Sequence, residues 1–357
     1  MTLHEHWERF MIRSIDVQNF RCFKHLRIPE LGRLNLIVGD NGAGKTALLE
    51  AIFLALCSSS EIGARIRAQR GLDGSFSGQV TRIEAALWGG LFYDGNMNQP
   101  ISVTLDGEGR ENRSLEISRR SAQEAVFQSF DKSVETRESP IMFSWRDHKG
   151  EFRTATPTVS SSGLKFPGTG EEFEDFFLFP ANQTVGSGDN ADRFSQLSQE
   201  GKHRRFVELF TKEYSWISDI NVEVYGGGPV LFATLENGRK IPVPNISGGI
   251  NRAMSFMLAI ASSTSGVVII DEIENGIHYS HQAGIWRALL TFMEEYSCQV
   301  FASTHSQECL AALSKVMPKG ADGIALLQME RGEIENSVRQ FSGKSLRLAL
   351  EYHEEIR

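Results

Sequence analysis

The hydrophobic pattern near the amino end of the chain predicts two strands followed by a helix. Apolar residues recur between Ile12 and Phe20 at the spacing of a strand, and we expect the ten residues before Met11 to form a poorly ordered extension. The run LNLIV is mostly apolar, which is typical of a buried parallel strand. After Thr46 the apolar residues recur at helical intervals, so a helix follows directly behind a glycine-rich loop.

The second half of the chain alternates between strand and helix patterns in the same way. FEDFFLFP returns to the core, and VLFATLENGRKIPV predicts a hairpin whose Asn237-Gly238 turn suits positive φ angles. The run VVII predicts a buried strand, QVFAST the last strand, and SLRLALEYHEEIR a terminal helix. A helix is also expected after the motif SGG, with a buried face made of Ile250, Met254, Met257, Leu258 and Ala261.

Together these patterns predict an α/β fold with a mixed central sheet, flanking helices and an inserted, irregular α+β region. We expect an N-terminal lobe at residues 1–57, an inserted region at 58–175 and a C-terminal lobe at 176–357. The inserted region contains a predicted hairpin at ISVTLDGEGRENRSLEIS, and no heptad pattern runs through it.

Composition narrows the function classes. The formal net charge of −8 argues against a surface that binds nucleic acid everywhere, so DNA binding needs a local argument. No apolar run reaches the roughly 18 residues that span a bilayer, and the first ten residues lack a signal peptide's apolar region, so we expect no membrane segment. The cysteines are dispersed and form no CxxC pair, which favours a reduced, cytoplasmic setting; they are Cys22, Cys57, Cys298 and Cys309.

The sequence GDNGAGKT matches the phosphate-binding pattern G-x-x-x-x-G-K-[ST], with a predicted strand before it and a predicted helix after it. Its glycines let backbone N–H groups surround phosphate oxygens, Lys45 supplies a positive charge, and the Thr46 hydroxyl is a ligand for Mg²⁺. The predicted ATP-binding loop consists of Gly39, Asp40, Asn41, Gly42, Ala43, Gly44, Lys45 and Thr46.

An acidic pair follows the buried strand VVII. Such a strand delivers Asp271 and Glu272 to its carboxyl end, where open α/β sheets bind ligands. We expect Asp271 to hold Mg²⁺ and Glu272 to orient or deprotonate the attacking water. In FASTHS, His305 stands just past the next strand, where it can sense the γ-phosphate, and Ser303 and Thr304 could assist it.

The motif SGG, formed by Ser247, Gly248 and Gly249, presents backbone N–H groups and a hydroxyl to an anion at the start of a helix. It precedes the acidic strand by about 20 residues, which one helix spans. We therefore expect the helix to carry its N-terminus away from the acidic strand's carboxyl end. On that expectation, the motif is too far from the phosphates of its own subunit and completes the site of a second subunit packed head to tail.

The order GDNGAGKT, ISGG, VVIIDEIENGIH, STHS resembles the ABC-type ATPase heads of the SMC and RecF group, and DEIENGIH with STHS is most similar to the overcoming-lysogenisation-defect (OLD) family. The resemblance covers roughly 1–57 and 176–357. It implies that Gly39 to Thr46 bind ATP, that Ser247 and Gly249 contact nucleotide in trans, and that Asp271 and Glu272 act on Mg²⁺ and water. It also implies that His305 senses the γ-phosphate and that His278 falls in the subunit-crossing D-loop.

The chain departs from these families in several places. Many OLD proteins carry a Toprim nuclease after the ATPase, whereas only about 50 residues follow His305 here, which leads us to expect a separate effector chain, as in two-gene antiphage systems such as PARIS. The missing heptads disfavour an SMC-type tether. The Q-loop glutamine could be Gln69, Gln79 or Gln183.

Two basic clusters can be interpreted either as solvated helix faces or as phosphate contacts. They are Arg65, Arg67 and Arg70, and Lys202, Arg204 and Arg205.

The resemblance implies an ATP-hydrolysing switch whose head-to-tail dimers control a partner effector, a nuclease in antiphage defence. A RecF-like DNA clamp and an ATP-bound scaffold without turnover are the alternatives, and a transporter subunit fits least.

Overall fold

The computed structural model describes residues 11–56, 88–107, 112–120, 136–146, 150–160, 163–165, 176–181, 186–263, 266–318, 320–332 and 335–351. The chain divides into two compact units. Unit 1 comprises Met1–Leu31, Asn41–Glu174 and Met329–Arg339, and unit 2 comprises Gly32–Asp40, Asp175–Gln328 and Gln340–Arg357. The predicted boundaries at residues 57 and 175 stay predictions.

Unit 1 is built on a six-stranded antiparallel sheet of order β2-β1-β4-β5-β7-β8. The predicted hairpin is confirmed as the β4–β5 pair, and it joins the same sheet as the first two strands of the chain. Helix α2 (Lys45–Leu56) is buried along most of its length, and Trp145 Nε1 donates to its Leu54 carbonyl at 3.0 Å. The sheet strands are β1 (Ile12–Phe20), β2 (Phe23–Ile28), β4 (Ile101–Gly107), β5 (Arg113–Arg119), β7 (Ile141–Arg146) and β8 (Phe152–Ala155).

Unit 1 also contains a smaller sheet of order β10-β9-β6 and two short 3₁₀ turns. They are β6 (Thr136–Glu138), β9 (Thr158–Ser160), β10 (Gly163–Lys165), η2 (Gly89–Leu91) and η3 (Tyr93–Gly95).

The second six-stranded sheet, of order β11-β15-β16-β3-β17-β18, lies mainly in unit 2. Neighbours from β11 to β3 are parallel, so their carboxyl ends meet at one edge of the sheet. The prediction that QVFAST is the last strand is wrong, because two more strands follow it. The strands are β3 (Leu34–Gly39), β11 (Phe176–Phe179), β15 (Val267–Ile270), β16 (Gln299–Ser303), β17 (Ile324–Glu330) and β18 (Ser337–Ser342).

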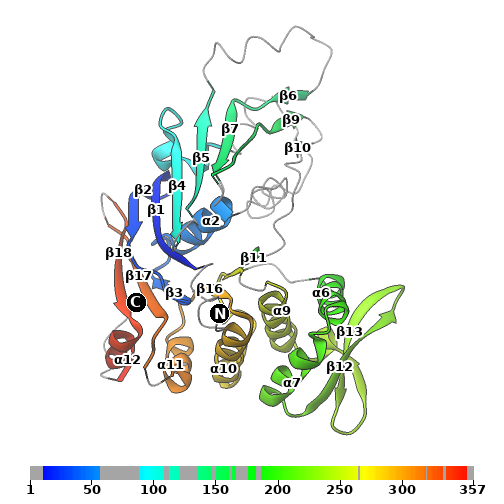
Figure 1. Ribbon diagram of the computed structural model, residues 1–357. Coiled ribbons are helices and arrows are strands. Elements are labelled where there is room, and N and C mark those ends of the chain that lie inside the picture. Colours follow the sequence, from blue (N-terminus) through cyan, green and yellow to red (C-terminus); the bar gives the residue numbers. More distant parts are fainter. Residues whose placement is uncertain are drawn as a thin grey trace. The chain divides into compact units, whose positions relative to one another are not determined.

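Five helices of unit 2 lie in a row in the order α6, α9, α10, α11 and α12 (Figure 1). No helix among the described residues is both long and apolar enough to cross a membrane. The helices are α6 (Ser187–Gln199), α7 (His203–Glu213), α8 (Val243–Ile246), α9 (Gly248–Ser262), α10 (Tyr279–Tyr296), α11 (Gln307–Val316) and α12 (Gly343–Glu351).

A three-stranded antiparallel sheet, β12-β13-β14, precedes α8. The predicted hairpin at Asn237-Gly238 is confirmed as the β13–β14 pair, and Gly238 has a φ of +79°. The strands are β12 (Ile217–Tyr225), β13 (Gly228–Leu235) and β14 (Lys240–Pro242).

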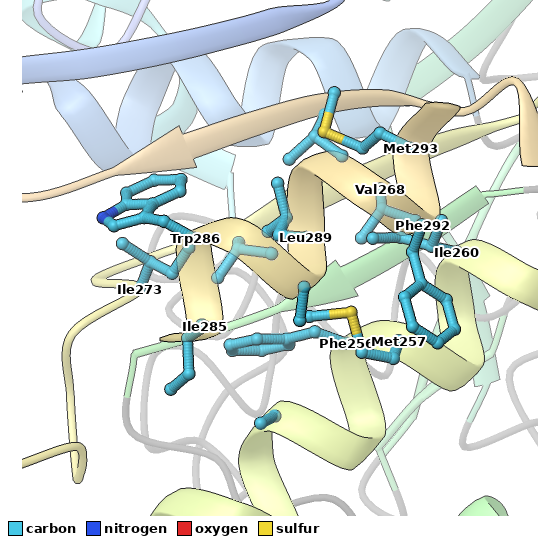
Figure 2. Close-up of a cluster of buried hydrophobic side chains, with 14 of the residues drawn as sticks. Phe256, Met257, Ile260, Val268, Ile273, Ile285, Trp286, Leu289, Phe292 and Met293 are labelled. Atoms are coloured by element: carbon cyan, nitrogen blue, oxygen red, sulfur yellow. The ribbon is translucent and has the colours of Figure 1, made fainter. Parts of the chain in front are cut away.

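The core of unit 2 lies where α9 and α10 pack on β15 (Figure 2). Trp286 and Phe292 of α10 are almost fully buried there, as is Phe256 of α9. Each such side chain contributes about 1.5–3 kcal/mol on burial, so this cluster fixes the two helices against the strand. Helix α9 is buried at every position from Ala253 to Ala261, so the single buried face predicted for it is too narrow.

Candidate functional site

The glycine loop is shaped by backbone angles that favour glycine. Gly39 ends β3 in unit 2, and from Asn41 on the loop lies in unit 1 and leads into α2, so the predicted strand and helix on either side are confirmed. Gly39, Gly42 and Gly44 have φ angles of +137°, +81° and +105°. A Cβ on Gly44 would lie 2.7 Å from the Phe23 ring and 2.8 Å from Cys22 Sγ, so both the angle and the space require glycine.

A serine hydroxyl joins the two members of the acidic pair at the carboxyl edge of β15 and β16. Ser303 Oγ donates to Asp271 Oδ1 at 2.5 Å and accepts the backbone N–H of Glu272 at 2.8 Å. Asp271 is 7% exposed and Ser303 is fully buried. Gly39 ends β3 at this same edge, because Ser303 is in register with Ile37. Ser303 was predicted to assist His305, and in the structure its hydroxyl holds the acidic pair.

Glu272 has a φ of +49°, a left-handed conformation that is uncommon outside glycine. Its backbone is fixed by the bond to Ser303 and by Arg252 Nη2, which donates to the Glu272 carbonyl at 3.3 Å. Its side chain remains 37% exposed. The fold thus fixes the main chain of Glu272 and leaves its carboxylate accessible to solvent.

His305 is held by a carboxylate that the sequence motifs did not identify. Glu274 Oε1 accepts the backbone N–H of His305 at 3.0 Å and lies 3.2 Å from its ring Nδ1, an ion pair when the imidazole is protonated. Glu272 Oε1 lies 4.0 Å from the same nitrogen. The imidazole is half exposed, whereas the Glu274 side chain is 9% exposed. Glu274 therefore orients His305 beside the acidic pair.

Helix α9 begins at the acidic edge, so the expectation that it carries its N-terminus away is wrong. Arg252, in the helix's second turn, donates through Nη2 to the carbonyl of Asp271 at 3.1 Å. A helix that enters a strand through a short connection runs antiparallel to it, so the helix begins where the strand ends. Burial lowers the pKa of Arg252, and the carboxylates of Asp271, Glu272 and Glu274 act in the opposite direction.

The SGG motif forms the exposed start of α9. Ser247 is its N-cap, with Oγ accepting the N–H of Ile250 at 3.1 Å, and Gly248 is exposed. A Cβ on Gly249 would lie 3.3 Å from the Gly276 carbonyl oxygen, so the tip packs closely on the turn that precedes His278. His278 caps α10 in a similar way, since its Nδ1 accepts from the Ser280 N–H at 3.4 Å.

Several residues that were candidates from the sequence are not part of the site described above. Arg65, Arg67, Arg70, Gln69, Gln79, Gln183 and Cys57 lie outside the described residues. In the second basic cluster, Lys202 pairs with Glu200 at 2.6 Å, and Arg205 binds Glu295 through two hydrogen bonds. These ion pairs favour the interpretation of that cluster as a solvated surface.

Sequence reasoning missed Glu274 and Arg252. Glu274 stands two residues after Glu272, within DEIEN, and a second acid at that spacing was a usable signal. Arg252 had none, because its contact with Asp271 depends on how α9 folds back along β15. The described residues contain no group of three His, Cys, Asp or Glu side chains that could hold a metal. The predicted ligands Thr46 and Asp271 are instead hard oxygen donors of the kind that suits Mg²⁺, which keeps several waters.

Comparison with known proteins gives a family match over most of the chain. A family model described as "AAA domain, putative AbiEii toxin, Type IV TA system" matches residues 34–311. A Helicobacter pylori protein named "ATP/GTP phosphatase" is 21% identical over 338 residues, which cover 86% of this chain and 88% of that protein.

Two further similarities are more limited. A Thermus scotoductus protein named "OLD nuclease" is 52% identical over 46 residues, which cover 13% of this chain and 8% of that protein. A solved structure described as an SMC head bound to the C-winged helix domain of ScpA has a TM-score of 0.48 and 14% identity, and the match covers 93% of this chain and 97% of that one.

Proposed function

Because the chain belongs to the family of AAA domains described above, and is an ATPase of that type, we propose that it is an ATP-driven switch. ATP pairs two copies head to tail, and hydrolysis separates them. The observation that carries this proposal is the network of Asp271, Glu272, Ser303, Glu274 and His305 at the sheet edge where the glycine loop begins. The network places an accessible carboxylate and an oriented imidazole side by side.

Each residue has a proposed role. The loop's N–H groups and Lys45 bind the phosphates, and Thr46 and Asp271 are the ligands for Mg²⁺. When bound, Mg²⁺ neutralises charge that develops on the phosphates. Glu272 orients the attacking water and accepts its proton, and His305, held by Glu274, donates a hydrogen bond toward the γ-phosphate.

The tip of α9 supports pairing in trans. Ser247 and Gly248 are exposed, and the start of a 15-residue helix carries partial positive charge that favours a phosphate. The proposal that the tip completes the site of a second copy does not depend on the expectation that α9 carries its N-terminus away from the acidic edge, which is wrong. It rests on the exposure of the tip and on the resemblance to ABC-type heads.

Glu272→Gln tests the catalytic assignment. We expect unchanged ATP affinity, an ATP-dependent dimer that persists in size-exclusion chromatography with light scattering, and a kcat lower by about 10²–10⁴-fold. Turnover at the wild-type rate would reject the assignment of Glu272.

Ser247→Arg tests the tip, and Ser247→Ala is its matched control. The arginine should block pairing and reduce turnover at least about tenfold by steric obstruction, whereas the alanine removes the hydroxyl without adding bulk, at a cost of about 1 kcal/mol to stability, and should still allow pairing. Full turnover and normal pairing in Ser247→Arg would show that the tip does not complete a site.

The proposed output is control of a separate effector, a Toprim-like nuclease in antiphage defence inside the bacterial cytoplasm. The short similarity to a protein named "OLD nuclease" supports a nuclease as the effector. The test is co-purification of the protein of the neighbouring gene with the Glu272→Gln variant in ATP. If that variant instead binds duplex DNA with strong salt dependence and no effector, the DNA-clamp alternative replaces this output.

A further inference from the structure

The connection between β17 and β18, Arg331 to Asn336, belongs to unit 1 together with most of the glycine loop. No motif in the sequence pointed to it, because both flanking strands were missed. At one end Asn336 contacts Ala43 of the loop, and at the other Arg331 lies close to Gly42.

Gly332 and Glu335, two described residues of the connection, are closely constrained. A Cβ on Gly332 would overlap the carbonyl oxygen of Glu335, so this turn requires glycine. The Glu335 carboxylate accepts the backbone N–H of His25 at 2.8 Å. At its flanks, Arg339 Nε lies 2.9 Å from Glu330 Oε1. These contacts constrain the backbone next to Arg331 and Asn336.

Asn336 holds the glycine loop from outside. Its Nδ2 donates to the Ala43 carbonyl at 3.0 Å; Asn336 is 8% exposed and Ala43 is fully buried. In a trans peptide the C=O and the following N–H point in opposite directions. A carbonyl held by Asn336 therefore turns the N–H of Gly44 away from Asn336, toward the inside of the loop where a phosphate binds.

Arg331 places a positive charge close to Gly42 of the glycine loop. Its Nη1 lies 3.8 Å from the position that a Cβ on Gly42 would occupy, and its side chain is exposed. Within the described residues, Arg331 has no hydrogen bond or ion pair, while the carboxylates of Glu330 and Glu335 have the partners given above. Its charge is thus available beside the apex of the loop.

We propose that two residues of this connection belong to the nucleotide site: Arg331 contacts the phosphate chain of a bound nucleoside triphosphate, and Asn336 is a positioning residue that orients the loop. The inference rests on the proposed function only in taking the glycine loop as the nucleotide site. It adds a residue that contacts the ligand from a segment far along the chain.

The test measures the affinity of the full chain for ATP and, by competition, for inorganic tripolyphosphate. Arg331→Ala should weaken both by about tenfold, as expected for loss of one charge-assisted hydrogen bond. Arg331→Lys should recover most of the loss. Arg339→Ala, which removes an arginine from the flanking strand, should leave both affinities unchanged.

Two results would overturn the proposal: wild-type affinity for both ligands in Arg331→Ala, or a loss for ATP without a loss for tripolyphosphate, which would place the contact on the nucleoside. Because Arg331 is exposed, we expect its variants to melt at the wild-type temperature. Lys45→Ala separates this inference from the proposed function. If Lys45→Ala abolishes ATP binding while Arg331→Ala binds ATP as tightly as the wild type, only this inference fails. If Lys45→Ala binds ATP normally, the glycine loop is not the nucleotide site and the proposed function fails.

Asn336→Ala tests the positioning role. We expect weaker binding of ATP with an unchanged kcat at saturation, because the loop's aim is lost while Glu272 is untouched. A purely structural role would instead lower the apparent kcat through loss of folded protein and leave the KM for ATP of the remaining enzyme unchanged. If Asn336→Ala does not fold, Asn336→Ser is the second variant, because serine retains a hydrogen-bond donor; it should fold and bind ATP with an intermediate affinity. Wild-type affinity for ATP in a folded variant without a donor at position 336 would reject the positioning role.

Discussion

The glycine loop and the acidic sheet edge are held in place by different means. The loop is shaped by main-chain angles, and its brace, Asn336, contacts a backbone carbonyl. At the acidic edge, side chains hold side chains, as Ser303 holds Asp271 and Glu274 holds His305. We therefore expect changes in the glycine loop, where backbone groups bind the phosphates, to lower the affinity for ATP. We expect changes at the acidic edge, where side chains position the catalytic groups, to lower kcat. The following predictions test that separation.

Gly44→Ala should have the largest effect. The methyl group would meet Phe23 and Cys22 at a φ of +105°, so the loop must move. We expect ATP affinity to fall by about 100-fold or more, measured by equilibrium binding, with the fold of α2 retained in circular dichroism. A variant that binds ATP normally but hydrolyses it slowly would contradict the separation.

Glu274→Gln should lower kcat by about tenfold with KM nearly unchanged, because His305 loses its charged partner while the loop is intact. Steady-state kinetics give the two values separately. Glu308→Gln is a matched control, since Glu308 is an acid near His305 whose carboxylate pairs with Ser306 instead. A change confined to KM would mean that Glu274 acts on binding.

Ser303→Ala removes two hydrogen bonds at once, one to Asp271 and one to Glu272. We expect a free energy of unfolding lower by about 1–3 kcal/mol and a kcat reduced by a few fold, because the Glu272 backbone then loses its contact with Ser303 and keeps its contact with Arg252. Chemical denaturation and turnover assays measure these two effects. Unchanged turnover with lowered stability would make Ser303 a structural residue only.

The order of strand, glycine loop and helix could be predicted from sequence, because the motif GDNGAGKT defines the turn and the apolar runs beside it indicate a strand before it and a helix after it. The acidic pair followed from the buried run VVII by the same logic. Strands β17 and β18, and with them Arg331 and Asn336, were not found. Their contacts with the loop join residues nearly 300 positions apart, which no local pattern reports. The predicted direction of α9 was wrong because it rested on the length of the helix alone. The chain reverses in the short connection after α9, so the helix runs back along β15 and begins near the carboxyl end of that strand.

Cys22→Ala should have the smallest effect. Its sulfur packs against Gly44, and burial raises the pKa of the Cys22 thiol, so it is mostly neutral at pH 7 and carries no charge to the phosphates. We expect ATP affinity to change by less than about twofold. A large loss would mean that side-chain packing, and not the backbone, sets affinity at the loop.

The central claim is that the tip of α9 in one copy completes the site of another. It is tested most directly by mixing Ser247→Arg with Glu272→Gln before ATP is added. Each variant alone should be nearly inactive. In a head-to-tail pair, the mixed dimer combines an intact Glu272 with an intact partner tip at one of its two sites, so a one-to-one mixture should recover about a quarter of wild-type turnover. A mixture no more active than its two components would contradict the account.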